Sequence, residues 1–383
     1  MRWSCSRNER SRGLGRGPRP SPLMTIGIPF RELPRAHGGP LGVGRLRVDP
    51  ADFVVEEELG FAPDGSGEHR LLWVRKTDAN TEWVARRLAE LAGVRTADVG
   101  FAGLKDRRAV TSQWFSLPAP KGEMPDWSRL ASQGIEVLAV HAHRRKLRRG
   151  SLKGNRFCIR VRAFDPQPGQ PPESWTTGFQ RRLAEIRRRG VPNYFGEQRF
   201  GHGGANLNRA DALLQGGLSR PNRHQRGIWL SAARSELFNR VLARRVSRGD
   251  WDKPVPGDCL NLAGSHSYFC VESVDAELTA RCDRFDLHPT GPLWGRGEPP
   301  TRGDVQALER ETAASLPGWG EGLERFGLEQ ERRPLRVAVL DLDGTAVSDG
   351  LELRFSLPAG AYATAVLREL IDWETGHDGE PSD

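Results

Sequence analysis

Hydrophobic residues recur along this chain in short runs and in strict alternation, and both patterns predict β-strands. Residues 53–55 and 71–74 are short apolar runs. The clearest alternation spans residues 156–163, where one face is apolar and the other carries three arginines. The apolar face consists of Phe157, Ile159, Val161 and Ala163. We therefore predict a half-buried strand there, with a basic exposed face.

Other stretches show the spacing of amphipathic helices. Residues 81–92 place Val84, Leu88 and Leu91 on one face, and Asn80 or Thr81 can cap the first turn. A second helix is expected at residues 180–189. A third is expected at residues 230–246, with an apolar stripe of Leu230, Ala233, Leu237 and Val241. The mixture of strands and helices indicates a chain that combines α and β structure.

The C-terminal part predicts two strands, at residues 336–342 and 351–357, followed by a helix near residues 364–373. Within it, Asp341-Leu342-Asp343-Gly344-Thr345 resembles the nucleophile motif of haloacid-dehalogenase-type phosphatases. Asp-Gly is also common in hairpin turns, and a second strand follows. We therefore favour a hairpin over a phosphatase site. The acidic residues 374–383 are expected to fray.

Composition narrows the class of protein. A length of 383 residues allows two or three domains. No apolar stretch approaches the ~18 residues that a membrane span needs, so we expect no membrane protein. The five cysteines are scattered and form no C-x-x-C pair. This argues against a disulfide framework or structural zinc and fits a reducing cytoplasm.

Charge is distributed unevenly. The net formal charge is +8, and residues 1–23 contribute six arginines against one glutamate. This segment is also rich in Ser, Gly and Pro and has no apolar core, so it is not a secretory signal. An organelle transit peptide would fit its composition. We favour a disordered arm, or an upstream reading of a gene that starts at Met24.

The densest chemical signal is the run Gly100-Phe101-Ala102-Gly103-Leu104-Lys105-Asp106-Arg107-Arg108. Asp106 is flanked by Lys105, Arg107 and Arg108, and nearby positive charges favour an ionised carboxylate that can act as a nucleophile or base. An ordinary salt-bridged loop would show the same pattern. The local pattern alone therefore leaves both interpretations open.

Residues 144–157 carry seven cations and no acid. Such a run can neutralise an RNA backbone. It ends in Gly154-Asn155-Arg156-Phe157, which places an amide and an aromatic ring beside the cations, as needed to bind and stack a base. A solvated charge run is the alternative, and we favour contact with nucleic acid.

The segment at residues 192–201, Pro-Asn-Tyr-Phe-Gly-Glu-Gln-Arg-Phe-Gly, is aromatic, polar and bounded by glycine. It can line an RNA surface, or its rings can pack at a junction between domains. The sequence pattern does not favour either interpretation over the other.

Six blocks in this order together resemble the tRNA pseudouridine synthase D (TruD) family. They are residues 100–116, 144–157, 191–207, 229–246, 290–297 and 353–370. The resemblance runs from about residue 41 to residue 372. It implies an enzyme, an isomerase that converts uridine 13 in the D-arm of tRNA to pseudouridine. It also implies an α+β fold whose pseudouridine-synthase core, a mixed and mainly antiparallel sheet, is interrupted by an inserted α/β domain.

The resemblance assigns residues by their motifs. Asp106 matches the catalytic aspartate, and Phe53, Asn155, Phe157 and Tyr362 match positions that line the substrate site. Many members have Phe where this chain has Tyr362, so its hydroxyl is an additional donor. We expect a cation beside Asp106, either Lys105 or Arg107, to keep the carboxylate charged. Asp106 would then attack C1′ or remove the C2′ proton, and the sequence does not choose between these routes.

The resemblance also implies an organisation and a set of partners. The catalytic domain would comprise residues 24–189 and 338–373, and the inserted domain residues 190–337. We expect tRNA as the partner, no cofactor, no metal, no membrane, a monomer and a cytoplasmic location. A non-catalytic RNA-binding protein would use the same basic and aromatic residues without needing Asp106, and it is the main alternative.

Overall fold

A computed structural model describes residues 26–120, 122–167, 172–217 and 221–375. The predicted arm at residues 1–23 lies outside the described residues, as does most of the predicted acidic tail, residues 376–383. None of the helices in the described part is long and apolar enough to cross a membrane.

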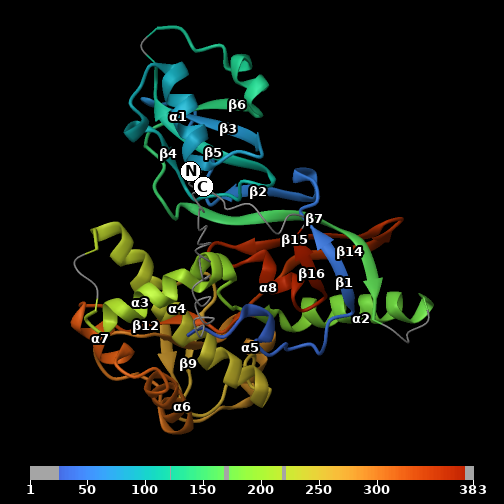
Figure 1. Ribbon diagram of the computed structural model, residues 1–383, viewed down its shortest axis with the longest axis vertical. Helices are drawn as coiled ribbons and strands as arrows, with labels where there is room; N and C mark the ends of the chain where they lie inside the picture. Colours follow the sequence, from blue (N-terminus) through green and yellow to red (C-terminus); the bar gives the residue numbers. More distant parts are fainter. Residues whose placement is uncertain (1–25, 121, 168–171, 218–220, 376–383) are drawn as a thin grey trace, which may run out of the picture.

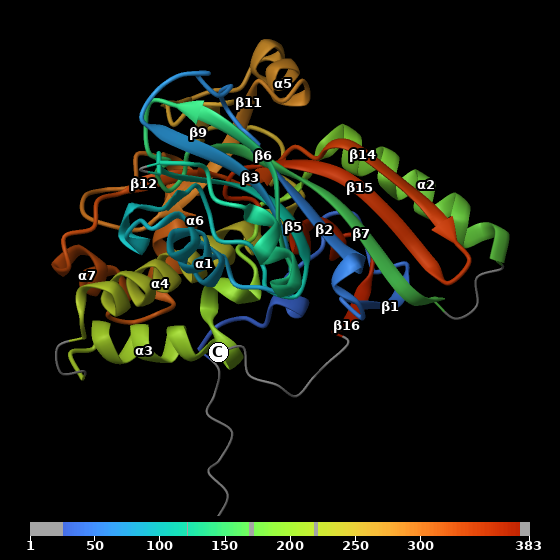
Figure 2. The same ribbon diagram turned by 90° about the horizontal axis from the view of Figure 1, so that it is seen from above.

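A ten-stranded sheet joins the first and last parts of the described chain, and its central strands run side by side in Figure 2. The strand order along the sheet is β14-β15-β7-β2-β5-β3-β6. Three further strands join it at the side: β1 pairs with β7, β16 pairs with β1, and β4 pairs with β5. Among the described pairs, β1–β16 and β2–β5 are parallel and the others antiparallel. The sheet is therefore mixed and mainly antiparallel, as predicted. The strands are β1 (Gly42–Leu46), β2 (Phe53–Leu59), β3 (His69–Thr77), β4 (Gly100–Phe101), β5 (Val110–Pro118), β6 (Ile135–His143), β7 (Leu152–Pro166), β14 (Leu340–Val347), β15 (Gly350–Pro358) and β16 (Asp372–Thr375).

A second sheet is built from the chain between these two parts. It has the order β10-β9-β11-β12 and lies at the lower left of Figure 1. Its strands are β9 (Cys259–Leu262), β10 (Tyr268–Cys270), β11 (Leu287–Leu293) and β12 (Glu331–Pro334). The chain enters this part through β8 (Val191–Pro192) and leaves it through β13 (Arg336–Val337), and these two strands pair with each other. The entry and exit points are therefore neighbours.

Helices cover both sheets. In the first part α1 packs on β3 and β5, and α2 contacts β14. In the second part α4 contacts β11, and α3, α6 and α7 pack around it. The helices are α1 (Thr81–Ala92), α2 (Pro172–Arg189), α3 (Ala205–Leu214), α4 (Arg223–Arg248), α5 (Ala276–Asp283), α6 (Gly303–Ala314), α7 (Trp319–Arg325) and α8 (Ala363–Leu367). Short 3₁₀ segments are η1 (Phe30–Glu32), η2 (Pro50–Asp52), η3 (Thr96–Asp98), η4 (Trp127–Gln133), η5 (Glu197–Phe200) and η6 (His202–Gly204).

All three predicted amphipathic helices are present, but the one predicted at residues 180–189 begins at Pro172. Helix α1 has the predicted bounds and ends at Gly93, whose φ of 65° suits a C-terminal glycine. Helix α4 begins after Asn222, whose side chain accepts a hydrogen bond from the Gln225 amide at 2.9 Å. The predicted stripe of α4 is buried. Helix spacing therefore predicted both elements, but α4 begins seven residues before its predicted start, and Asn80 makes no side-chain capping bond in α1.

Strand β7 confirms the predicted alternation except at its end. Phe157, Ile159 and Val161 are buried, whereas Ala163 is exposed and has a φ of 48°. The register of the β1–β7 pair shifts nearby, between Val43 and Arg45. The prediction that Ala163 shares the buried face is therefore wrong, because an irregularity in the pairing rotates the backbone there.

The C-terminal predictions need several corrections. A hairpin forms, but its first strand is β14 at residues 340–347 and not 336–342, because Arg336–Val337 is the separate strand β13. The turn is at residues 348–349, and Asp343 and Gly344 lie within β14. A Cβ on Gly344 would lie 2.8 Å from Phe179, so this glycine permits the close approach of α2 instead of making the turn. The predicted helix at 364–373 stops at Leu367, and Asp372–Thr375 forms β16 on β1. Glu374 and Thr375 are therefore paired, not part of a frayed tail.

The cysteine prediction is wrong as well. Cys259 and Cys270 form a disulfide, with Cα atoms 3.9 Å apart. They lie directly opposite each other on β9 and β10. The absence of a C-x-x-C pattern is uninformative for such a pair, because an antiparallel hairpin brings together residues eleven positions apart.

One hydrophobic core runs through both parts of the molecule. It includes Ile159 and Phe355 of the large sheet together with Leu237 and Phe238 of α4. A separate cluster lies between α1 and strands β3 and β5. The shared core holds the middle part of the chain in a fixed position beside the large sheet.

Candidate active site

A cavity of about 260 Å³ opens where the two parts of the molecule meet. Its walls come from β2, the loop between β4 and β5, β7, the segment after β8, and the loop between β15 and α8. The predicted site residues that line it are Phe53, Lys105, Asp106, Asn155, Phe157 and Tyr362. Residues more than 300 positions apart thus share one cavity.

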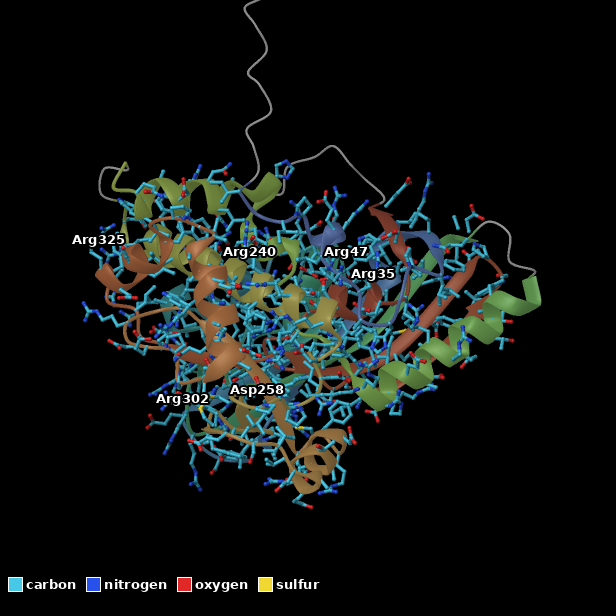
Figure 3. The ribbon with its side chains drawn as sticks, turned by 90° about the horizontal axis from the view of Figure 1, so that it is seen from below. Arg35, Arg47, Arg240, Asp258, Arg302 and Arg325 are labelled. Carbon is cyan, nitrogen blue, oxygen red and sulfur yellow. A yellow bond between two sulfur atoms is a disulfide. The ribbon has the colours of Figure 1, made fainter. Side chains whose placement is uncertain are left out.

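Asp106 presents its carboxylate at this cavity. The side chain is 30% exposed, so a ligand can reach it. Oδ2 accepts a hydrogen bond from Arg47 Nη2 at 2.6 Å, and Oδ1 accepts one from Gln198 Nε2 at 3.2 Å. Arg47 lies beside the blue ribbon of the N-terminal part in Figure 3. The carboxylate is therefore held from two sides while remaining accessible.

The cation that contacts Asp106 is Arg47, and neither predicted candidate fills this role. Lys105 pairs instead with Glu57, and both of these side chains are nearly buried. Arg107 faces Asp78, with Nε 3.8 Å from Oδ1. Side chains adjacent in sequence leave the backbone in different directions, so neighbours of an aspartate need not contact it. Lys105 still lines the cavity, whereas Arg107 does not.

A buried lysine anchors the backbone of Asp106. Lys76 on β3 is fully buried, and its Nζ donates to the Asp106 carbonyl at 2.8 Å. Burial lowers the pKa of Lys76 to about 8, although the nearby negative charge of Asp106 acts in the opposite direction. Lys76 therefore ties the loop that carries Asp106 to the sheet.

Aromatic rings form one wall of the cavity. The rings of Phe53 and Phe157 meet edge to face, with centroids 6.3 Å apart. Phe157 also stacks on Phe355 at 5.3 Å. Arg47 lies 4.2 Å above the ring of Phe53, which adds a cation–π contact. These contacts hold both predicted rings at the same cavity as Asp106.

Asn155 carries a polar atom with no partner. Its Oδ1 is buried and accepts no hydrogen bond from the described residues. A buried acceptor of this kind costs free energy unless a ligand or water satisfies it. Asn155 lines the cavity, so this buried oxygen belongs to a residue that borders the space a ligand would fill.

Tyr362 lies on the opposite side, directly before α8. Its ring is 6.2 Å from that of Phe195, and the loop that carries it is held by Arg333. Arg333 Nη2 donates to the Gly360 carbonyl at 3.0 Å and to Asn193 Oδ1 at 2.6 Å. The cavity wall that contains Tyr362 is thus braced by the middle part of the chain.

Sequence patterns missed Arg47, Lys76 and Gln198. The aromatic segment at residues 192–201 was singled out, and its rings do pack inside the molecule: Tyr194 and Phe195 are buried. Gln198 from the same segment is exposed and contacts Asp106, so the segment both packs at a junction and reaches the site. Arg47 and Lys76 lie in no distinctive pattern, and only the fold brings them to Asp106.

Metal-binding clusters are absent from the part of the chain that the structure describes. No group of three or more His, Cys, Asp or Glu side chains there could hold a metal ion. Asp341 and Asp343, the acids of the phosphatase-like motif, are exposed on β14 and do not line the cavity. Their position gives no support to a phosphatase site.

Comparison with known proteins identifies relatives along nearly the whole chain. The family model for tRNA pseudouridine synthase D (TruD) matches residues 38–214 and 205–370. The tRNA pseudouridine synthase D of Methylococcus capsulatus is 50% identical, covering 90% of this chain and 96% of the relative. That of Nitrosococcus oceani is 50% identical, covering 88% and 93%.

A solved structure shares the fold. It is a Methanosarcina mazei protein crystallised as a candidate tRNA pseudouridine synthase D (TruD), and it superposes with a TM-score of 0.67 at 22% identity. The match covers 88% of this chain and 95% of that one. Family model, relatives and fold agree, and the chain belongs to the tRNA pseudouridine synthase D (TruD) family.

Proposed function

We propose that this protein isomerises uridine 13 in the D-arm of tRNA to pseudouridine, with Asp106 as the catalytic carboxylate. Family membership supports the reaction and the tRNA substrate, because the relatives carry the name tRNA pseudouridine synthase D. The observation that carries the role of Asp106 is its place: an accessible carboxylate shares one cavity with a stacked phenylalanine and an unpartnered amide oxygen.

The reaction is internally balanced. The N1–C1′ bond breaks, uracil turns, and a C5–C1′ bond forms, while C5 loses a proton and N1 gains one. No electron or group comes from outside, so no cofactor is required. Asp106 starts the cleavage, either by attack of its carboxylate on C1′ or by removal of the C2′ proton.

The cavity residues then hold the base while it is detached. Phe157 stacks on uracil, and its own position is fixed by Phe355 behind it. Asn155 Oδ1 accepts a hydrogen bond from a donor of the base or ribose. Phe53 and Tyr362 close the remaining sides. Retaining the free base is essential, since it must re-bond through a different atom.

Arg47 and Gln198 orient the carboxylate. Each binds a different oxygen of Asp106, so the carboxylate plane is defined before substrate arrives. Gln198 belongs to the segment that follows β8, whereas Asp106 belongs to the large-sheet part. The two parts of the molecule therefore cooperate at one side chain. Arg47 also supplies the positive charge that we had expected from Lys105 or Arg107.

The basic run supplies phosphate contacts beside the cavity. The Gly150 amide donates to the Ala102 carbonyl at 2.8 Å, so the cations at residues 144–149 lie next to the catalytic loop. Arg144, Arg145, Arg148 and Arg149 are exposed. Their contacts with the RNA backbone offset the cost of turning the target uridine out of its stack.

We infer that residues 190–337 form the inserted domain and that residues 24–189 and 338–373 form the catalytic domain. The pairing of β8 with β13 supports this division, because an insertion leaves and re-enters its host at neighbouring positions. A monomer that acts in the cytoplasm is the simplest state for such an enzyme.

Pseudouridine mapping of tRNA incubated with purified protein tests the proposal. The wild type should modify position 13, and Asp106→Asn should lower the rate by about 1,000-fold or more, which corresponds to about 4 kcal/mol. Asp341→Asn serves as the matched control, because Asp341 is an exposed aspartate outside the cavity. Its activity should equal that of the wild type.

Three outcomes would contradict the proposal. Full activity of Asp106→Asn would remove the catalytic role of this residue. Modification of another position would refute the assignment to uridine 13. Tight binding of tRNA by the wild type without any pseudouridine would indicate the non-catalytic RNA-binding protein instead.

A further inference from the structure

Leu104 stands out among the residues at the cavity because it is apolar and exposed. Its side chain is 63% exposed, the largest value among the large hydrophobic residues that the structure describes. It lies two positions before Asp106 and lines the same cavity. An isolated exposed leucine needs no explanation on an ordinary surface. Leu104, in contrast, is exposed on the loop that carries Asp106, where bound RNA would contact it.

The backbone on both sides of Leu104 is anchored by buried polar groups. The Lys105 amide donates to Thr81 Oγ1 at 3.0 Å, and Gln113 Nε2 donates to the Gly103 carbonyl at 3.2 Å. Thr81 and Gln113 are buried and bonded to each other at 3.0 Å. The loop therefore cannot easily fold inward to hide Leu104, and the side chain is presented to solvent by a rigid support.

Cations lie beside this apolar side chain. The hydrogen bond from Gly150 to Ala102 places the basic run against the same loop, two residues before Leu104. RNA bound through its phosphates by the basic run would bring its bases over the catalytic loop. The apolar side chain closest to Asp106 and exposed on that loop is Leu104.

We propose that Leu104 is a wedge that enters the base stack where the target uridine has swung out, and thereby holds the RNA open while that uridine occupies the cavity. This inference rests on the proposed function. Proteins that distort nucleic acids insert apolar side chains between bases in this way, because the contact replaces part of the stacking that is lost. Leu104 has the size, the exposure and the rigid support for this role.

The test uses a tRNA transcript that the wild type modifies, with 2-aminopurine beside the target uridine to report unstacking. With wild type and with Leu104→Met, which keeps a long apolar side chain, fluorescence should rise on binding. With Leu104→Ala, the rise should shrink by about threefold or more and the single-turnover rate of pseudouridine formation should fall about tenfold. Affinity, set mainly by phosphate contacts, should change much less.

A second transcript separates the wedge from a structural effect. If the base opposite the target is changed to create a mismatch, the target is already partly unstacked, and the rate defect of Leu104→Ala should shrink to about threefold or less. Leu340→Ala is the control, because Leu340 is 55% exposed but lies outside the cavity, beside the exposed Asp341. It should behave as wild type.

Several results would overturn the wedge. Normal fluorescence and rate with Leu104→Ala would do so, as would an equal defect on the paired and mismatched transcripts, which would point to the cavity itself. These results leave the proposed function intact, since the wild type remains active. An inactive wild type would instead refute the proposed function, and the wedge with it.

Discussion

Two clusters of charged side chains, one in the middle part of the chain and one at the cavity, differ in their exposure to solvent. In the middle part, Arg245 of α4 binds Asp258 at 2.7 Å and Asp250 at 2.8 Å, and the Arg245 and Asp258 side chains are almost fully buried. Figure 3 marks Asp258 within the yellow-orange ribbon. At the cavity, Asp106 and Arg47 are 30% and 22% exposed. One cluster is closed to solvent, and the other is open.

This difference in exposure distinguishes charged groups that stabilise the fold from charged groups that a substrate can contact. Asp258 uses both oxygens on Arg245 and accepts a further bond from the Val255 amide. Such a group has little capacity left for a ligand. At the cavity, Asp106 stays accessible and Asn155 Oδ1 has no partner among the described residues. An accessible charged group at a cavity, beside a residue with an unpartnered polar atom, is thus a better guide to function than the number of charges.

The strongest test of this comparison removes a partner from the closed cluster. Asp258→Ala leaves Arg245 buried without its main counter-charge, so the free energy of unfolding should fall by about 3–5 kcal/mol. Urea denaturation measures this loss. Folded Asp258→Ala should retain the wild-type rate of pseudouridine formation. A large loss of rate at unchanged stability would show that this buried cluster serves the reaction and not only the stability of the fold.

Lys76 of β3 sharpens the comparison, because it is buried yet binds the backbone carbonyl of Asp106. Its pKa in the folded protein is about 8, below its ordinary value of 10.5. Between these pH values the unfolded chain binds more protons, so stability should rise with pH across this window. The gain attributable to Lys76 is about 3 kcal/mol at most.

Lys76→Met should lack this gain. The difference in unfolding free energy between wild type and Lys76→Met should therefore change between pH 8 and pH 10, measured by urea denaturation. Lys153→Met, which alters an exposed lysine, provides the control. Identical pH profiles of wild type and Lys76→Met would show that the lysine is not held in this buried position.

The smallest expected effect concerns Gln198. Gln198→Ala removes one hydrogen bond to Asp106 from an exposed side chain, so kcat should fall about fivefold, corresponding to about 1 kcal/mol. Stability and KM should change little. Gln225→Ala, which alters an exposed glutamine of α4, is the matched control. A rise in KM at unchanged kcat would show that Gln198 contacts RNA instead of orienting Asp106.

Local patterns predicted strands β2, β3, β7 and β15 of the large sheet and most of helices α1, α2 and α4, but not strands β1, β5 and β6. They failed where a distant strand supplied the decisive contact. Residues 372–373 were predicted as helix and residues 374–375 as frayed tail, but all four pair with β1, which precedes them by more than 300 residues. Gly344 resembles a turn residue, but it permits the close approach of Phe179 and Leu183 of α2. The intrinsic preference of a residue for helix, strand or turn is weak, and such tertiary contacts override it.

At the candidate site, too, local sequence patterns predicted the residues within motifs but not their distant contact partners. The motifs around Asp106, Asn155 and Phe157 were distinctive enough to single out by sequence, and the structure brings them to one cavity. The partners of Asp106 were not predicted. Arg47 is 59 positions before it and Gln198 is 92 positions after it, and nothing in the local pattern links them.

By itself the sequence determined the family, the mixed fold and the residues that we propose carry the chemistry, because each depends on motifs and periodicities that are local in the chain. The tertiary structure alone decided which cation holds Asp106, which lysine anchors its loop and which leucine remains exposed beside it. These contacts depend on the path of the backbone through the fold. That path is determined by packing across the whole core, not by the residues next to each other in sequence.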